Sequence, residues 1–143
     1  MGLIADVRAG CVDVLETVRD DNPSLLGEVY SARPASLALG IPCAYVGDFR
    51  GNLSHTVLIR QWSGAEQDVV LVFPSWDNAE QQEQADTLVQ LVIDAFPQDG
   101  HFANDNMVGS PVRIRTATEL ETNGTSYPAV VVTIGSISYL EGR

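Results

Sequence analysis

One short segment limits the folds that this chain can adopt. Residues 69–73 read VVLVF, so a strand at this position is apolar on both of its faces. Such a strand must lie in the centre of a sheet or be covered on its second face, because water would otherwise contact its apolar side chains. Residues 112–116 (VRIRT) instead alternate apolar and polar side chains, which predicts a half-exposed strand. The chain therefore requires a sheet with a buried centre and a more polar margin.

Two amphipathic helices are predicted to pack on that sheet. Residues 3–20 carry apolar side chains at helical spacing, and Cys11 lies in the middle of the apolar stripe. A second helix is predicted to start at Asp77, an N-cap that forms a capping box with Glu80, and to stop at Pro97. Its apolar positions are Ala85, Leu88, Val89, Val92, Ile93 and Phe96. Each helix therefore has one face for the core and one for water.

Short strands are predicted for most of the remaining chain. They lie at residues 29–32, 41–46, 54–62, 68–73, 112–116 and 127–134, and the last has room to extend through Tyr139. A glycine-bracketed loop at 47–52 and a turn at 63–66 divide three of them into an antiparallel meander. We therefore expect a single α+β domain over residues 1–143, an antiparallel or mixed sheet of about five to six strands, and two main helices packed on one face.

The charge of the chain is strongly negative and unevenly spread. There is no lysine, and eight arginines face nineteen acids, which gives a formal net charge of −11. No cation lies between Arg60 and Arg113, whereas nine of the nineteen acids do. Binding to nucleic acid through released counterions needs a basic patch, so sequence-specific binding of DNA or RNA is not expected.

The sequence gives no sign of membrane insertion or export. No stretch approaches the roughly 18 apolar residues of a membrane helix. Asp6 and Asp13 interrupt the first segment, where a signal peptide would be continuously apolar. We therefore expect no membrane partner, and a protein that is made and kept in the cytoplasm.

The usual metal-ligating residues do not gather at ligand spacing. His55 and His101 each lack a second histidine or a cysteine nearby. Glu80, Glu83 and Asp86 follow one another along the second helix, but the Glu-x-x-His pairs of a di-metal bundle are missing. We expect no metal site, and interpret these carboxylates as a solvated or partner-facing helix surface.

Nucleophilic catalysis has one weak candidate. Cys43, Asp48 and His55 are close in sequence and would meet only if a hairpin folded them together. The apolar string around Cys43 favours a packed thiol instead, as does the position of Cys11 in the helix stripe. No phosphate loop or dinucleotide fingerprint is present. We therefore expect no catalytic residue, no cofactor and no enzymatic activity.

Two loops combine aromatic side chains with charged or polar ones, as interface hot spots do. The first is the loop at 47–52 and the second is the segment at 98–110. The alternative is that each phenylalanine packs back onto the sheet. The candidate interface residues are Phe49, Arg50, Asn52, His101 and Phe102 in these loops, together with Glu80, Glu83 and Asp86 of the second helix.

Several segments taken together resemble one family. They are the N-terminal helix, residues 30–34 (YSARP), the PCAYVG strand, the acidic helix after the third strand and the closing YPAVVVTI strand. In these segments and in length the chain resembles the tail terminator, or tail completion, proteins of long-tailed bacteriophages. The resemblance covers nearly the whole chain.

The resemblance implies a structural virion protein that works by assembly. Such a subunit forms a hexameric ring on the finished tail tube, halts tube polymerisation and offers a surface to the head. Its partners would be further copies of itself, the tail-tube protein and the head–tail connector protein. It would act in the host cytoplasm during assembly and then remain in the virion tail. A negative ring lining would let DNA slide through without sticking.

Two other functions stay open. A head-side neck or head–tail connector subunit would share the size and the lack of chemistry. A small cytosolic enzyme or ligand-binding domain would instead be a monomer or dimer with a concave apolar pocket. Thiol reagents would inactivate that third kind of protein if Cys43 were important.

Overall fold

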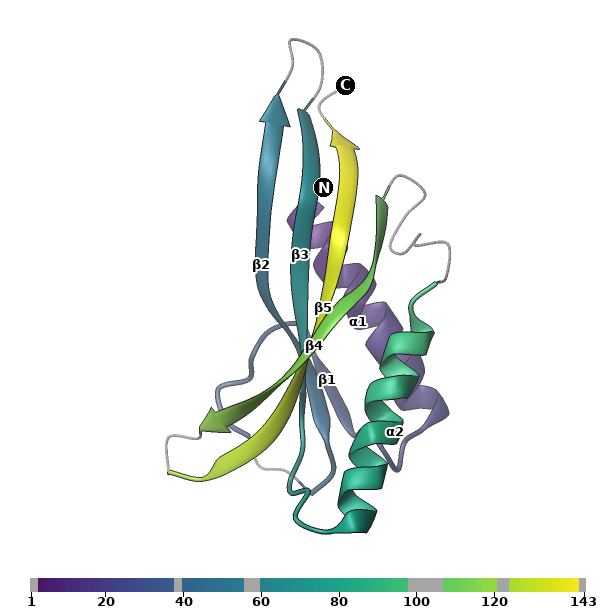
Figure 1. Cartoon of the computed structure of the whole chain (residues 1–143), viewed down its shortest axis with the longest axis vertical. Helices are drawn as coiled ribbons and strands as arrows, with labels where there is room; N and C mark the ends of the chain where they lie inside the picture. Colours follow the sequence, from purple (N-terminus) through teal and green to yellow (C-terminus); the bar gives the residue numbers. More distant parts are fainter. Residues whose placement is uncertain (1–2, 38–39, 56–59, 98–106, 121–123, 142–143) are drawn as a thin grey trace.

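The computed structural model describes residues 3–37, 40–55, 60–97, 107–120 and 124–141 (Figure 1). The elements are α1 (Leu3–Asp21), β1 (Glu28–Tyr30), β2 (Cys43–His55), β3 (Arg60–Val72), α2 (Ala79–Ala95), β4 (Met107–Leu120) and β5 (Ser126–Glu141). The strand order is β1-β2-β3-β5-β4, with β1 parallel to β2 and the other neighbours antiparallel. The prediction of a single α+β domain with a mixed sheet and two helices is confirmed.

The strands are longer than the sequence patterns predict. The expected loop at 47–52 lies inside β2 and the expected turn at 63–66 lies inside β3, so the three-strand meander is wrong. In β2 the register shifts between Val46 and Phe49, because one extra residue is inserted opposite β3. In β3 Gly64 has a positive φ of 68° where the register shifts again. These are β-bulges, which bend a strand without ending it.

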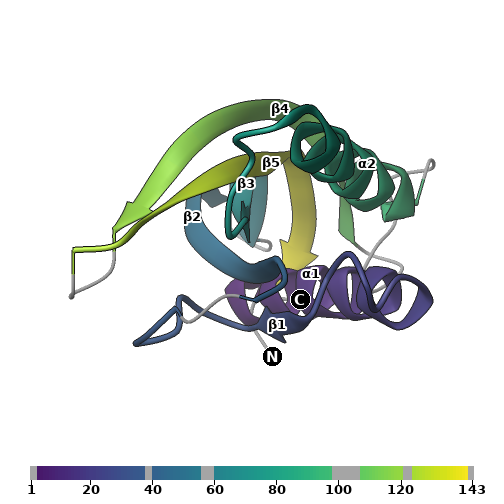
Figure 2. The same cartoon turned by 90° about the horizontal axis from the view of Figure 1, so that it is seen from below.

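The two helices cover one face of the sheet. Figure 2 shows the sheet curving from β2 round to β4, with α1 nearer β1 and α2 nearer β4. Val7, Cys11 and Leu15 of α1 form one buried cluster with Leu88 of α2 and Leu71 of β3. We call this side of the sheet the helix-covered face.

The opposite face holds a second, smaller buried cluster. Its members alternate along the strands with those of the first cluster, as Val70 and Val72 do with Leu71. Leu37, from the segment after β1, joins this cluster. Residues 69–72 therefore lie in a central strand that is buried on both faces, as predicted, and Phe73 directly after the strand is buried too. We call this second side the helix-free face.

The start of α2 differs from the prediction by one residue. Asn78, not Asp77, is the N-cap, and its side chain accepts a hydrogen bond from the backbone N–H of Gln81 at 2.9 Å. The side-chain oxygen of Gln81 in turn accepts from the backbone N–H of Asp77 at 3.0 Å. Asn78 and Gln81 thus stabilise this terminus in place of Asp77 and Glu80.

Candidate assembly surface

The structure moves the first group of predicted interface residues away from a loop. Phe49, Arg50 and Asn52 all lie in β2, and Phe49 packs against the cluster of the helix-covered face. Asn52 pairs with Ser63 through the backbone. Arg50 is exposed. The loop assignment is therefore wrong, because a bulge and a turn use the same kinds of residue.

The other predicted interface residues have different outcomes. Glu80, Glu83 and Asp86 lie on α2 and are exposed, as the acidic helix surface requires. His101 and Phe102 fall outside the described residues. Part of the segment expected to be a loop is a strand, since β4 begins at Met107.

A ladder of ion pairs crosses the helix-free face. Strand register places Arg50 opposite Glu66, and Thr133 next to both Asp68 and Arg113. The guanidinium of Arg50 donates to both carboxylate oxygens of Asp68, at 3.0 and 2.9 Å, and to Glu66 at 3.2 Å. Arg113 donates to the same Glu66 oxygen at 2.8 Å, and Thr133 donates to Asp68 at 2.9 Å. The ladder therefore links β2, β3, β5 and β4.

The ladder keeps its carboxylates ionised. Burial raises the pKa of Asp68, but hydrogen bonds from Arg50 and Thr133 more than offset this, so the pKa lies below its ordinary value. Hydrogen bonds from Arg113 and Arg50 likewise lower the pKa of Glu66. The hydrogen bond to Asp68 raises the pKa of Arg50 further. All three groups are charged at neutral pH.

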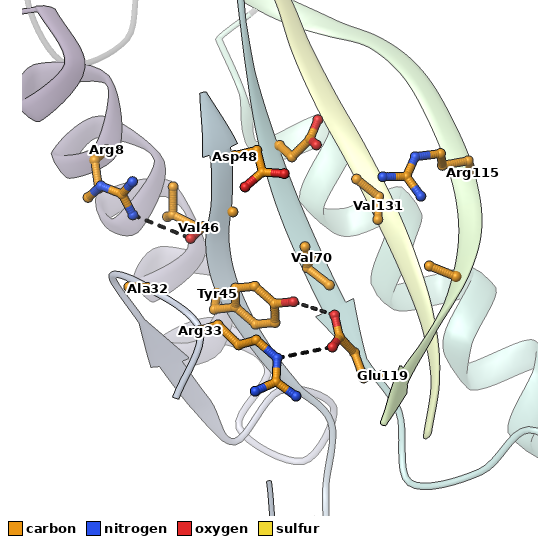
Figure 3. Close-up of a pocket in the computed structure, with 13 residues that line it drawn as sticks. Arg8, Ala32, Arg33, Tyr45, Val46, Asp48, Val70, Arg115, Glu119 and Val131 are labelled. Atoms are coloured by element: carbon orange, nitrogen blue, oxygen red, sulfur yellow. Dashed lines mark hydrogen bonds and ion pairs between the residues drawn. The ribbon is translucent and has the colours of Figure 1, made fainter. Parts of the chain in front are cut away.

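A second charged group fastens the segment after β1 to the sheet. Arg33 donates through Nε to Glu119 at 3.1 Å, and the hydroxyl of Tyr45 donates to the other oxygen of Glu119 (Figure 3). Burial and this hydrogen bond raise the pKa of Tyr45. Tyr127 donates to the carbonyl of Leu37 at 3.2 Å. These contacts hold residues 31–37 over one end of the helix-free face.

A depression of about 390 Å³ lies between the two charged groups. Val70 and Val131 are among the apolar residues that line it. Figure 3 shows Arg8 approaching from α1 on one side and Arg115 from β4 on the other. Arg8 donates to the carbonyls of Ser31 and Val46, the latter at 3.3 Å. Arg115 makes no ion pair with the described side chains, although its charge contributes to the lowered pKa of Asp68.

The fold thus gathers arginines that are scattered in the sequence. Five of the eight line the depression or the ladder, and only one of them, Arg50, was predicted from the sequence as an interface residue. The i,i+2 spacing of Arg113 and Arg115 was a usable signal, since it puts both on one face of a strand. Four described carboxylates lie on the same surface as the five arginines. This surface is therefore close to neutral, although the chain has a net charge of −11. The arginines are Arg8, Arg33, Arg50, Arg113 and Arg115, and the acids are Asp48, Glu66, Asp68 and Glu119.

The weak candidate for nucleophilic catalysis does not assemble. Cys43, Asp48 and His55 all belong to β2, which puts the first and last roughly 40 Å apart at the rise of a strand. Burial raises the pKa of the Cys43 thiol to about 11 and that of Cys11 to about 12. Both cysteines are free and buried, as predicted. Among the described residues, no three metal-ligating side chains cluster.

Comparisons with known proteins leave the chain without a family. No protein-family model matches it, and no curated protein does. Across the described residues, none of the helices has the length and apolar character needed to cross a membrane.

Proposed function

We propose that this chain is the subunit of a homo-oligomeric ring that ends the tail tube of a long-tailed bacteriophage and joins it to the head. The tail-tube role rests on the sequence resemblance to tail terminator proteins, and the observation that supports a ring is the contrast between two surfaces of one small domain. The helix-free face carries arginines and is nearly neutral, whereas α2 exposes acids and contains no cation. A subunit with two unlike surfaces is suited to the head-to-tail contacts of a cyclic ring.

The edge strand β4 gives further support for assembly. Val112 and Ile114 are 46% and 57% exposed, although both are large and apolar. They lie on an edge strand with no neighbour on its outer side among the described residues. An open groove of about 680 Å³, lined in part by Val89, Ile93 and Ile114, runs between α2 and β4. Exposed apolar edges of this kind invite pairing unless a partner covers them.

The chemistry of the thiols weighs against the enzyme alternative. A nucleophilic cysteine needs a lowered pKa and access to solvent, and Cys43 has a raised pKa and is buried. The alternative of a thiol-dependent activity therefore has no support at this residue.

The proposal is tested by tube assembly in vitro. Tail-tube protein of the same phage is polymerised with and without this chain, and tube lengths are measured by negative-stain electron microscopy. We expect short tubes that carry a ring at one end. We also expect light scattering to give the oligomer a mass six times that of one chain. A chain that leaves tube lengths unchanged would contradict the terminator role. Binding to the head connector protein without any effect on tubes would favour the neck-subunit alternative.

A further inference from the structure

We propose that the acidic surface of α2 in one copy docks into the arginine-lined depression on the helix-free face of a second copy. The occupant of the depression is thus another molecule of the same chain. This inference rests on the proposed homo-oligomer and identifies the contact that forms it.

The depression has unused hydrogen-bond donors around an apolar floor. Arg8 and Arg115 flank it, and neither has a carboxylate partner among the described side chains. Arg115 is exposed, and a guanidinium carries five N–H donors that suit a carboxylate. Asp68 and Glu119, which also line the depression, are already held by arginines and hydroxyl groups. Only Asp48, exposed at the rim, adds an uncompensated negative charge.

The surface of α2 offers the complementary charge. Glu80, Glu83 and Asp86 follow at spacings of three residues, so they lie near one another along the helix. All three are exposed, and none makes an ion pair with the described side chains. Like charges at this spacing repel one another, and in a free subunit only water and dissolved salt weaken this repulsion. Docking on arginines that have no carboxylate partner among the described side chains would relieve it directly.

One molecule does not pair its own two surfaces. The helix α2 packs on the helix-covered face, whereas the depression opens on the opposite side of the sheet. Arg115 also lines the groove between α2 and β4 together with Asp86, but these two described side chains form no ion pair, and Glu80 and Glu83 line neither cavity. A contact of Glu80 and Glu83 with the depression therefore joins different copies. Because the two surfaces are unlike, each copy presents its α2 surface to one neighbour and its depression to another, which gives a heterologous contact. Such a contact closes into a ring when its rotation divides a full turn, and it otherwise produces a filament.

The apolar groove beside α2 enlarges the docking surface. Val89 and Ile93 of α2 line it with Ile114 of β4, next to the carboxylate of Asp86. The floor of the arginine-lined depression is apolar as well and contains Val70 and Val131. A stable interface buries about 800 Å² on each partner, more than a few ion pairs supply. In this arrangement the carboxylates of α2 lie at the boundary between subunits rather than free in the ring channel.

A charge-swap experiment tests the contact. Glu83→Arg lowers the negative charge of the α2 surface and Arg115→Glu cancels positive charge at the depression, and both positions are exposed, so the fold should persist. Each variant alone replaces the central attraction by a repulsion between like charges, and we expect the concentration needed for half-assembly to rise at least about tenfold. When the two variants are mixed in equal amounts, they can alternate around a ring. The two altered surfaces then meet each other with opposite charges, and the two unaltered surfaces form the natural contact. We therefore expect the mixture, and the double variant alone, to assemble again.

Matched controls apply the same charge changes elsewhere. Asp13→Arg and Arg19→Glu on α1 change the net charge equally but lie outside both surfaces, and we expect them to assemble like the wild type. Mass by light scattering and thermal unfolding are measured for every variant.

The outcomes separate this inference from the proposed function. Rings that form normally in both single variants would overturn the docking contact and leave the ring proposal standing. Charge-swap rescue together with tubes of unchanged length would support the contact and overturn the terminator role. A wild type that stays monomeric at every concentration would overturn both.

Discussion

The two faces of the sheet are built from alternate residues of the same strands, yet different forces stabilise them. The helix-covered face buries aliphatic side chains such as Val69 and Leu71 against two helices. The helix-free face carries Asp68 and Val70 from the same strand, and its centre is held by the ladder and a small apolar cluster. The first face therefore specifies the fold, and the second is free to vary its charge and to contact partners.

Neighbouring residues on β3 give the largest expected contrast between the faces. Leu71→Ala removes a fully buried side chain from the helix-covered face and should cost about 2–5 kcal/mol of unfolding free energy. Val70→Ala, on the helix-free face, should cost about 1–2 kcal/mol of unfolding free energy, because the substitution removes fewer atoms and no helix packs over this face. Urea unfolding measures both values. Equal costs would mean that the helix-free face contributes as much packing as the core.

Gln67 tests how the helix-covered face tolerates the bulge in β2. Its amide nitrogen donates to the carbonyls of Gly47, Asp48 and Asp68, each at 3.0 Å, and its side chain is fully buried. Gln67→Met keeps the side-chain length and removes the donor, so we expect a loss of about 1–3 kcal/mol. Thermal unfolding gives the value. An unchanged melting temperature would show that the bulge needs no such support.

The close packing of β4 on β5 provides a test at the margin of the sheet. A Cβ added at Gly135 would lie 2.6 Å from Cγ2 of Val112, which is shorter than any normal contact. We expect Gly135→Ala to cost about 1–3 kcal/mol by overpacking. Val112→Ala removes both clashing methyl groups, so the double variant should recover most of that loss. A double variant no more stable than Gly135→Ala would rule out this contact as the cause.

The sequence predicted the elements in which a local pattern is strong. Residues 69–73, both helices and the extension of the last strand through Tyr139 follow from apolar periodicity alone. The bulges were misread as a loop and a turn, because the glycines at 47 and 64 do not reveal whether a partner strand continues past them. The arginine-bearing surface was missed for a related reason. Its residues come from distant segments. Strand register brings Arg50, Arg113 and Arg115 together, and the packing of α1 and of the segment after β1 adds Arg8 and Arg33.

The ladder makes the helix-free face sensitive to acid. The pKa of Asp68 is lowered on folding from 3.8, and that of Glu66 from 4.5. Their contribution is therefore fully present above these ordinary values and is lost as pH falls through the lower folded-state values. Asp68→Asn should lose about 1–2 kcal/mol at pH 7 and show a shallower decline in acid. Urea unfolding between pH 7 and pH 2 checks this. A parallel decline in the variant would place the acid sensitivity elsewhere.

The carboxylates of α2 should show the smallest effect on stability. Glu83→Gln removes a like charge between Glu80 and Asp86 on an exposed helix surface, beyond the first helical turn, so unfolding free energy should rise by about 0.2–0.5 kcal/mol or stay unchanged. Differential scanning calorimetry resolves the change. A clear loss of stability would mean that this carboxylate has a structural role within the subunit, contrary to the division between the two faces.

The central claim is that this chain works by assembling through its exposed surfaces. Sedimentation velocity of the wild type over a wide range of concentration and salt tests it most directly. We predict a single closed species, several times the 15.4 kDa mass of the chain, that dissociates on dilution and as salt screens the charged contacts. A particle of 15.4 kDa at every concentration and every salt level would contradict it.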